Sequence, residues 1–223
     1  MQCVFGDRVA FARILQKALE FFAEGKAKHC LLVVADSLID DAMLDQQLEE
    51  ELLKHGGNPV GYIPGEGAAM ILLSASTGTA SKGQGLAAKI GVQINHDVID
   101  TYDADAARDL WLGGKLANLI KTQLQHGYAQ QIFPQQICDT NGEERRAIEM
   151  GNIMVKLKTA YPEANFLESQ IPALGFGEMG ALMGPVALAT GMASIQRRYA
   201  RQREFLITLS EVDGKRAVIQ LQF

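Results

Sequence analysis

The 223-residue sequence contains little cysteine, and the few cysteines it has are widely spaced. Cys3, Cys30 and Cys138 form no CxxC pair, and no histidine lies at metal-ligand spacing from them. An odd number of scattered cysteines argues against a disulfide framework and a zinc site, and it is typical of a reducing compartment. We therefore expect a cytoplasmic protein with no metal and no bound cofactor.

The sequence also lacks an excess of positive charge. It has 21 Lys and Arg against 26 Asp and Glu, which gives a formal net charge of −5 at pH 7. Without a basic field to attract phosphate backbones, nucleic-acid binding is not expected. With only six prolines, 48% hydrophobic and 21% charged residues, the composition is that of an ordinary globular protein and excludes a collagen-like or disordered chain.

Long hydrophobic runs are missing as well. The first residues, MQCVFGDRVAF, have neither the basic region nor the continuous apolar region of a signal peptide. The longest uncharged stretch, residues 179–196, is rich in Gly, Ala and Met and contains Pro185, so it makes a poor membrane span. We expect no membrane span and interpret this stretch as a helix covered by protein on both sides.

Hydrophobic periodicity predicts a mixed α/β chain. Apolar residues three and four apart indicate helices, and short apolar runs between turn signals indicate strands. The expected helices cover residues 6–25, 39–54, 106–126, 143–159 and 179–196. The expected strands cover residues 29–35, 68–73, 88–94, 131–138, 205–209 and 217–221, and we interpret the first of them as fully buried.

Two features suggest how the chain is divided. Residues 74–85 (SASTGTASKGQG) are small and polar, which is typical of a linker. We therefore place a boundary near residue 80, between a part covering residues 1–80 and a part covering residues 81–223. The order helix, strand, excursion, strand over residues 7–74 recurs as helix, strand, tight turn, strand over residues 179–222, which indicates two related halves.

Three stretches resemble the β-ketoacyl synthase branch of the thiolase-like superfamily. Residues 65–74 (GEGAAMILLS) are similar to the Gly-Glu-Gly-Ala-Ala strand entry of that family. Residues 138–151 (CDTNGEERRAIEMG) stand where the family has a His-Gly-Thr-Gly-Thr turn, and residues 177–184 (GEMGALMG) resemble its Gly-His-Thr-Gly-Ala-Ala-Ser-Gly stretch. The resemblance covers nearly the whole chain. It implies a thiolase-like α/β fold layered α-β-α-β-α, with the first half incomplete because the elements preceding the nucleophile helix are absent.

The family transfers an acyl group to a cysteine and then carries out a decarboxylative condensation. A helix N-terminus favours the thiolate, and two histidines stabilise the developing negative charges. In this sequence the nucleophile position falls near Arg8, and Cys3 lies before it; Asp139, with Asn141 close by, stands at the first histidine position and Glu178 at the second. Because a carboxylate repels a developing anion, these replacements oppose the reaction.

The resemblance therefore implies a catalytically silent subunit or accessory protein in fatty acid or polyketide-type acyl-chain assembly. The partners that it implies are an acyl carrier protein or a complete β-ketoacyl synthase chain, in a homo- or heterodimer. Two alternatives stay open. One is an active acyltransferase of the 3-oxoacyl-carrier-protein synthase type that uses Cys3 or Cys138, and the other is a non-catalytic module that binds an acyl group or a carrier protein.

Other motifs carry less weight. Residues 175–180 (GFGEMG) fit GxGxxG, but the segment before them is a poor strand, so we interpret them as a turn that allows close backbone packing. Asp100, Asp103 and Asp105 lack the later Gly and Glu of a calcium loop, so we interpret them as residues of a solvent-exposed face. The four histidines receive no role. Four arginines close the last predicted helix and offer a docking patch for an acidic carrier protein: Arg197, Arg198, Arg201 and Arg203.

Overall fold

The structure is a computed structural model that describes residues 3–75, 86–99, 104–124, 133–166 and 168–223. Its helices are α1 (Arg8–Ala23), α2 (Asp41–Glu49), α3 (Ala104–Trp111), α4 (Gly114–Leu124), α5 (Glu144–Ala160), α6 (Ala173–Phe176) and α7 (Met183–Gln196), with a 3-10 turn η1 (Gly180–Leu182) before α7. Its strands are β1 (His29–Ser37), β2 (Glu66–Ser74), β3 (Lys89–Asn95), β4 (Gln135–Cys138), β5 (Glu204–Ser210) and β6 (Arg216–Gln222).

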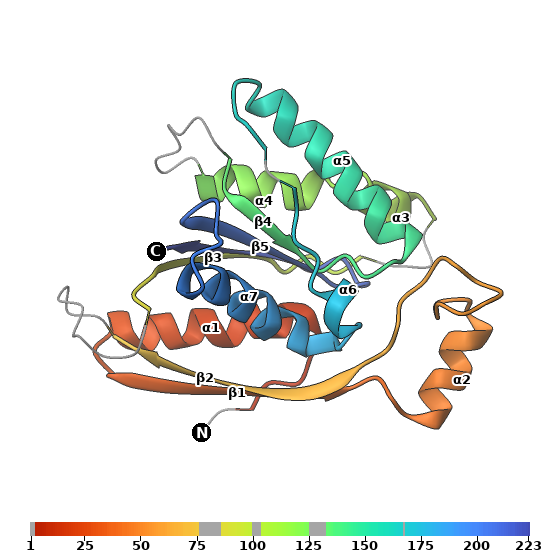
Figure 1. Ribbon diagram of the computed structural model, residues 1–223, viewed down its shortest axis with the longest axis horizontal. Coiled ribbons are helices and arrows are strands. Elements are labelled where there is room, and N and C mark those ends of the chain that lie inside the picture. The colour runs from red at the N-terminus through yellow and green to blue at the C-terminus, as the bar shows by residue number, and fades with distance from the viewer. Residues whose placement is uncertain (1–2, 76–85, 100–103, 125–132, 167) are drawn as a thin grey trace.

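The strands form two sheets with a layer of helices between them (Figure 1). β1 and β2 pair antiparallel, and the second sheet has the order β3-β6-β5-β4, in which β4 is parallel to β5 and the other pairs are antiparallel. α1 and α7 lie between the sheets, and α3, α4 and α5 cover the far face of the four-stranded sheet. The predicted layered α/β arrangement is confirmed, with helices between the two sheets and on the far face of the four-stranded sheet.

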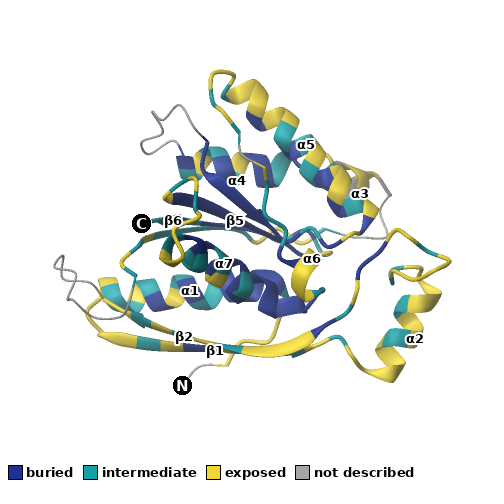
Figure 2. Ribbon diagram, in the orientation of Figure 1, coloured by how far each residue is buried: buried dark blue, intermediate teal, exposed yellow. Residues whose placement is uncertain are grey.

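The central helices bury the side chains that hold the layers together (Figure 2). Phe11 and Leu15 of α1 and Leu188 of α7 belong to one core cluster with Ile207 of β5 and Ile219 of β6. The uncharged sequence of α7 agrees with its position, because both neighbouring layers are apolar. A Cβ atom at Gly184 would overlap the ring of Phe11, so the small residue is what allows α1 and α7 to pack closely.

The two halves repeat the same unit, as the pattern predicted. α1 leads into the antiparallel pair β1 and β2, and α7 leads into the antiparallel pair β5 and β6. A second core cluster, between the four-stranded sheet and the outer helices, joins Leu116 and Ile120 of α4 to Ile153 of α5 and to Leu206 and Val218 of the sheet. The repeat brings the N-terminal ends of α1 and α7 to the same side of the molecule.

Three sequence-based expectations about elements are wrong. The helix expected over residues 106–126 is two helices, because Gly113 has a φ of +68° and ends α3, and a Cβ there would lie 3.0 Å from the Glu149 carbonyl oxygen. The helix expected over residues 39–54 is the shorter α2, which ends before Glu51 at a φ of 55°. The strand β1 is not fully buried, because burial alternates along it and its outward-facing side chains are exposed.

Other expectations are confirmed or lie outside the described residues. The strand expected over residues 131–138 begins at Gln135, directly after Pro134. Residues 175–180 form a turn: Gly177 has a φ of +78°, and a Cβ there would lie 2.8 Å from the Ile63 carbonyl oxygen. The linker residues 76–85, the boundary near residue 80, Asp100, Asp103 and His126 lie outside the described residues.

Candidate functional site

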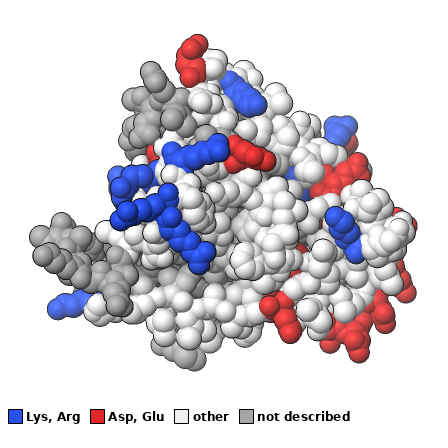
Figure 3. Space-filling model, in the orientation of Figure 1, with Lys and Arg blue, Asp and Glu red and all other residues white. Residues whose placement is uncertain are grey.

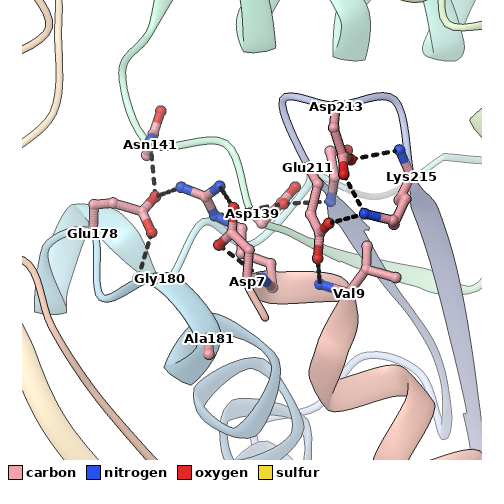
Figure 4. Close-up of polar contacts among 12 residues, drawn as sticks. Asp7, Val9, Asp139, Asn141, Glu178, Gly180, Ala181, Glu211, Asp213 and Lys215 are labelled. Carbon is pink, nitrogen blue, oxygen red and sulfur yellow. Dashed lines mark hydrogen bonds and ion pairs between the residues drawn. The ribbon is translucent and has the colours of Figure 1, made fainter. Parts of the chain in front are cut away.

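A cluster of buried charged side chains lies where the N-terminal ends of α1 and α7 meet (Figure 4). Arg8 is the first residue of α1, and its Nη2 lies 2.7 Å from Glu178 Oε2 while its Nε lies 4.0 Å from Asp139 Oδ2. All three residues are buried. Burial alone would lower the pKa of Arg8, but the negative charges of Glu178, Asp7 and Asp139 outweigh it and raise that pKa, so the guanidinium stays charged.

Glu178 is held from three directions. It accepts hydrogen bonds from Asn141 Nδ2 at 2.7 Å and from the Gly180 amide at 2.8 Å, in addition to its ion pair with Arg8. The side chain comes from the turn between α6 and η1, where Gly177 and Gly180 both have positive φ values. A carboxylate that is 1% exposed and has three donors is a satisfied structural anion rather than a reactive acid.

Asp139 follows the last residue of β4 and links that strand to β5. Its Oδ2 accepts from the Ser210 amide at 2.7 Å and from Arg146 Nη1 at 3.4 Å. Burial raises the pKa of Asp139 more than Arg146 and Arg8 lower it. The residue at the first histidine position of the resemblance is therefore a buried hydrogen-bond acceptor, which cannot donate to a developing anion while it is ionised.

Further charged residues surround these three. Burial would raise the pKa of Glu143, but Arg146 and Arg145 outweigh it and lower that pKa to about 2. Arg216 holds Glu149 with two hydrogen bonds of 2.8 and 3.1 Å. Sequence reasoning missed these partners, because nothing in the spacing of Arg146, Glu149 and Arg216 along the chain indicates that they meet.

The start of α1 is also bound from the other half of the fold. Glu211 Oε1 accepts a hydrogen bond of 3.0 Å from the Val9 amide, and the Asp7 side chain accepts from the Arg8 amide. Both bonds satisfy amides that the first turn of a helix leaves without partners. The helix end that would lower the pKa of a nucleophile is therefore occupied by two carboxylates.

The structure brings together some of the residues selected from the sequence and separates others. Asp139, Asn141 and Glu178 lie together around Arg8. Cys3 is exposed and takes no part in this cluster, and Cys138 is buried. Burial raises the pKa of the Cys138 thiol, so it is a poor source of thiolate.

An open cavity of about 450 Å³ lies beside the cluster, between α2 and the start of α5. Its lining includes Arg8, Tyr62, Arg145 and Arg146 and, from α2, Gln46 and Gln47. Within the ranges that the structure describes, no group of three or more metal-ligating side chains occurs. No helix of those ranges has the length and apolar character needed to cross a bilayer.

Comparison with known proteins identifies the fold. No protein-family model and no curated protein matches the sequence. The oxazolomycin ketosynthase domain of Streptomyces albus matches in structure with a TM-score of 0.70 at 13% identity, over 98% of this chain and 45% of that chain. The ishigamide ketosynthase/chain length factor matches with a TM-score of 0.62 at 17% identity, over 98% of this chain and 55% of that chain. This chain has the ketosynthase fold.

A third ketosynthase was solved in complex with its type II acyl-carrier protein and bound to a hexaketide. It matches with a TM-score of 0.62 at 14% identity, over 97% of this chain and 57% of that chain. The chain thus spans about half the length of the ketosynthase structures it matches. The resemblance drawn from three short sequence stretches is confirmed at the level of the fold.

Proposed function

We propose that the chain is a catalytically silent β-ketoacyl synthase-like subunit or accessory protein in fatty acid or polyketide-type acyl-chain assembly. One observation carries the proposal: Arg8, near the position that the resemblance assigns to the nucleophile, forms one buried ion-pair cluster with Asp139 and Glu178, at the two histidine positions. Arginine has no nucleophilic atom at neutral pH because it stays protonated. The cluster is a structural replacement for a catalytic site.

The two alternatives have weaker support. An active acyltransferase needs a thiolate near an oxyanion site, but Cys3 is exposed outside the cluster and the pKa of Cys138 is raised by burial. A module that binds acyl chains needs an apolar channel, and the cavity at the cluster combines apolar side chains such as Leu38 and Met43 with three arginines and four carboxylates. The first alternative therefore lacks a thiolate at this site, and the second lacks a channel that is apolar throughout.

A condensation assay tests the proposal. Purified protein is incubated with malonyl-carrier and acyl-carrier substrates, alone and with Cys3→Ala and Cys138→Ala variants as matched controls. We expect no condensation product from any of the three proteins. Product formation that either cysteine replacement abolishes would contradict the proposal and favour the acyltransferase.

The outer face of β1 and β2 supports a partner chain. Leu31, Val33, Met70 and Leu72 are 59%, 58%, 75% and 68% exposed on that face, and the register pairs Leu31 with Leu72 and Val33 with Met70. Contiguous apolar side chains on a sheet face usually mark an interaction surface. Among the described residues no helix covers this face, and α2 lies beyond the end of the two strands (Figure 1). We propose a homodimer, or a heterodimer with a complete synthase chain, that covers it.

Light scattering tests the assembly. We expect a dimer at micromolar concentration, or a complex when a complete synthase chain is added. The variant Val33→Lys should weaken either assembly, because it places a charge in an apolar contact. The variant Val155→Lys, which changes an equally exposed valine on α5, should have no effect. A monodisperse monomer that does not bind a synthase chain would contradict the proposal.

Four arginines support a carrier-protein partner; the sequence predicted that they close the last helix, but the structure places them after the end of α7, in the segment that leads to β5. Arg197, Arg198, Arg201 and Arg203 are exposed, and basic side chains gather over this part of the surface, while acidic ones gather around α2 (Figure 3). α7 has 14 residues, which at about 1.5 Å per residue places this patch about 21 Å from the start of the helix. A carrier docked there would contact the chain at the end of α7 opposite the ion-pair cluster.

Charge reversal tests this docking patch. The double variant Arg198→Glu/Arg201→Glu should weaken binding of an acidic carrier protein, and added salt should weaken binding by the parent. The variant Lys158→Glu reverses an exposed charge on α5 and serves as the control. Equal carrier binding by all three proteins would contradict the proposed patch.

A further inference from the structure

The sheet formed by β1 and β2 has two strands, whereas the other sheet has four. The internal repeat makes β1 the counterpart of β5, because each follows a central helix and pairs antiparallel with the next strand. β5 lies between two strands, β6 and β4, but β1 has a single strand neighbour among the described residues, β2. One edge of β1 therefore lacks the neighbouring strand that its counterpart has.

The backbone hydrogen bonds show which residues of β1 face this free edge. Directly after β1, the Leu38 amide donates to the Gly65 carbonyl oxygen at 3.1 Å. In an antiparallel pair, residues that bond to the partner strand alternate with residues whose backbone groups point away from it. The even-numbered residues of β1 therefore bond to β2. The odd-numbered residues, which include Leu31, Val33 and Ala35, direct their N–H and C=O groups to the free edge.

No feature of β1 protects this edge against pairing. Edge strands in native proteins usually carry charges, a proline or a bulge, or are very short. β1 has nine residues without glycine or proline, and its register with β2 is continuous, which excludes a bulge. Its one acidic side chain, Asp36, accepts from the Ala181 amide of η1. The free edge of β2 is less suited to pairing, because that strand contains Gly67 and begins with Glu66.

The strand β1 is complementary to β1 of a second copy of the chain. In an antiparallel pair centred on Val33, Leu31 lies opposite Ala35 of the second copy, and Val33 lies opposite Val33. The residues that meet are uncharged, their free backbone groups face each other, and all nine residues of the strand are paired.

The charges at the two ends of β1 favour the same arrangement. Lys28 directly precedes β1, Asp40 and Asp41 follow it, and all three are exposed. An antiparallel pair brings the basic end of one copy towards the acidic end of the other, whereas a parallel pair would bring like charges together. Charge complementarity therefore selects the antiparallel pair of two copies.

We propose that two copies of this chain pair through the free edges of β1, antiparallel about Val33, and form one continuous sheet of four strands in the order β2-β1-β1-β2. The inference goes beyond the proposed function. It concerns the edge of β1, and the pair leaves the outer face of β1 and β2 open for the partner proposed above. Cross-linking at the edge tests it, so either proposal can fail while the other stands.

Disulfide cross-linking tests the register of the pair. Opposite residues of a hydrogen-bonded antiparallel pair have Cα atoms about 5.5 Å apart, which a disulfide can join. In a Cys3→Ala background, Val33→Cys should therefore give a covalent dimer under mild oxidation at micromolar concentration. Leu31→Cys should not, because the two cysteines would lie four residues apart along the pair, about 14 Å. The double variant Leu31→Cys/Ala35→Cys should again give a covalent dimer.

A cysteine at Met70 controls for random collisions. Met70 is 75% exposed, against 58% for Val33, and it lies on β2, away from the proposed contact. Met70→Cys should therefore cross-link much more slowly than Val33→Cys. Equal rates for these two variants, or no covalent dimer from Val33→Cys, would overturn the proposal.

Two proline variants test the edge without changing the exposed apolar row of the sheet face. Ala35 and Ala68 lie opposite each other in the register, and their N–H groups point to the free edges of β1 and β2, respectively. Ala35→Pro removes a donor from the proposed contact and should abolish the dimer in light scattering. Ala68→Pro places the same residue at the other edge, so it controls for strain in the sheet and should stay dimeric. A dimer that persists in Ala35→Pro, or that is lost in both variants, would overturn the proposal. If Ala35→Pro does not fold, the cross-linking of Val33→Cys decides alone.

Discussion

Replacing Arg8 by methionine tests whether the ion-pair cluster holds the two halves of the fold together. Glu178 would lose its 2.7 Å ion pair and keep two uncharged donors, Asn141 Nδ2 and the Gly180 amide. Removing one partner of a buried ion pair costs about 3–5 kcal/mol, because the other charge is left buried and uncompensated. That is a large part of the roughly 5–15 kcal/mol by which a domain is stable. For a chain of this size the melting temperature should fall by roughly 6–20 °C.

A compensating variant separates lost charge balance from lost packing. In Arg8→Met/Glu178→Gln no charge is left without a partner at position 178. Asn141 and Gly180 donate to different oxygens of Glu178, so the single glutamine oxygen keeps one of these two hydrogen bonds. Replacement of a buried ion pair by neutral groups of similar volume is often neutral in stability. The double variant should therefore recover part of the loss, because the buried charge is removed although one hydrogen bond is lost. Arg197→Met, at an exposed arginine after α7, should unfold as the parent does.

Urea unfolding followed by the fluorescence of Trp111 and by circular dichroism measures these differences. If Arg8→Met does not fold at all, recovery of soluble folded protein in the double variant still tests the argument. A single variant that unfolds within about 1 kcal/mol of the parent would refute the reasoning, since surface substitutions already cause changes of about half that size. So would a double variant that is no more stable than Arg8→Met.

Three further outcomes follow from the structure. Gly184→Leu should lower the melting temperature by several degrees, because overpacking a buried site costs about 1–3 kcal/mol. The control Gly151→Leu, where a Cβ meets open space, should melt as the parent does. Equal melting temperatures of the two variants would contradict the packing of α1 against α7. A thiol reagent should modify exposed Cys3 in the native protein and buried Cys138 only after unfolding, and fast native labelling of both would contradict the burial of β4. The pKa of Glu143 is about 2, against 4.5 for an ordinary glutamate, so the ionised side chain contributes about 3 kcal/mol to the free energy of unfolding above pH 4.5, and this contribution is lost as the pH falls towards 2. Glu143→Gln should therefore lower the stability at pH 7 and make it less dependent on pH between 4.5 and 2. Urea midpoints that change in parallel for the parent and the variant across that range would contradict this.

The sequence predicted most helices and strands correctly, because the spacing of apolar residues within each segment depends only on that segment. The apolar spacing in α1, the short runs of β5 and β6 and the uncharged sequence of α7 each predicted the element that the structure contains. The break between α3 and α4 was missed because a glycine within a helical pattern does not reveal whether the chain there takes a positive φ. The exposed face of β1 was missed because an apolar run does not reveal which layers cover it.

The candidate site was predicted in part. The resemblance located Asp139 and Glu178, and it placed the nucleophile position near Arg8, but sequence reasoning treated these residues as replacements of catalytic residues rather than as partners of one another. Their ion pairs join residues far apart in the chain, and the two halves must fold together before the charges meet.

The central claim, that the cluster replaces a catalytic site, is tested most directly by measuring intact mass after incubation with an acyl thioester. The family reaction begins with transfer of the acyl group to a cysteine, so an active protein gains the mass of one acyl group and the thiol carrier leaves. We predict that the mass of the parent stays unchanged, both alone and in the presence of a complete synthase chain that itself becomes acylated. Addition of one acyl group to this chain, abolished in Cys3→Ala or in Cys138→Ala, would contradict the account.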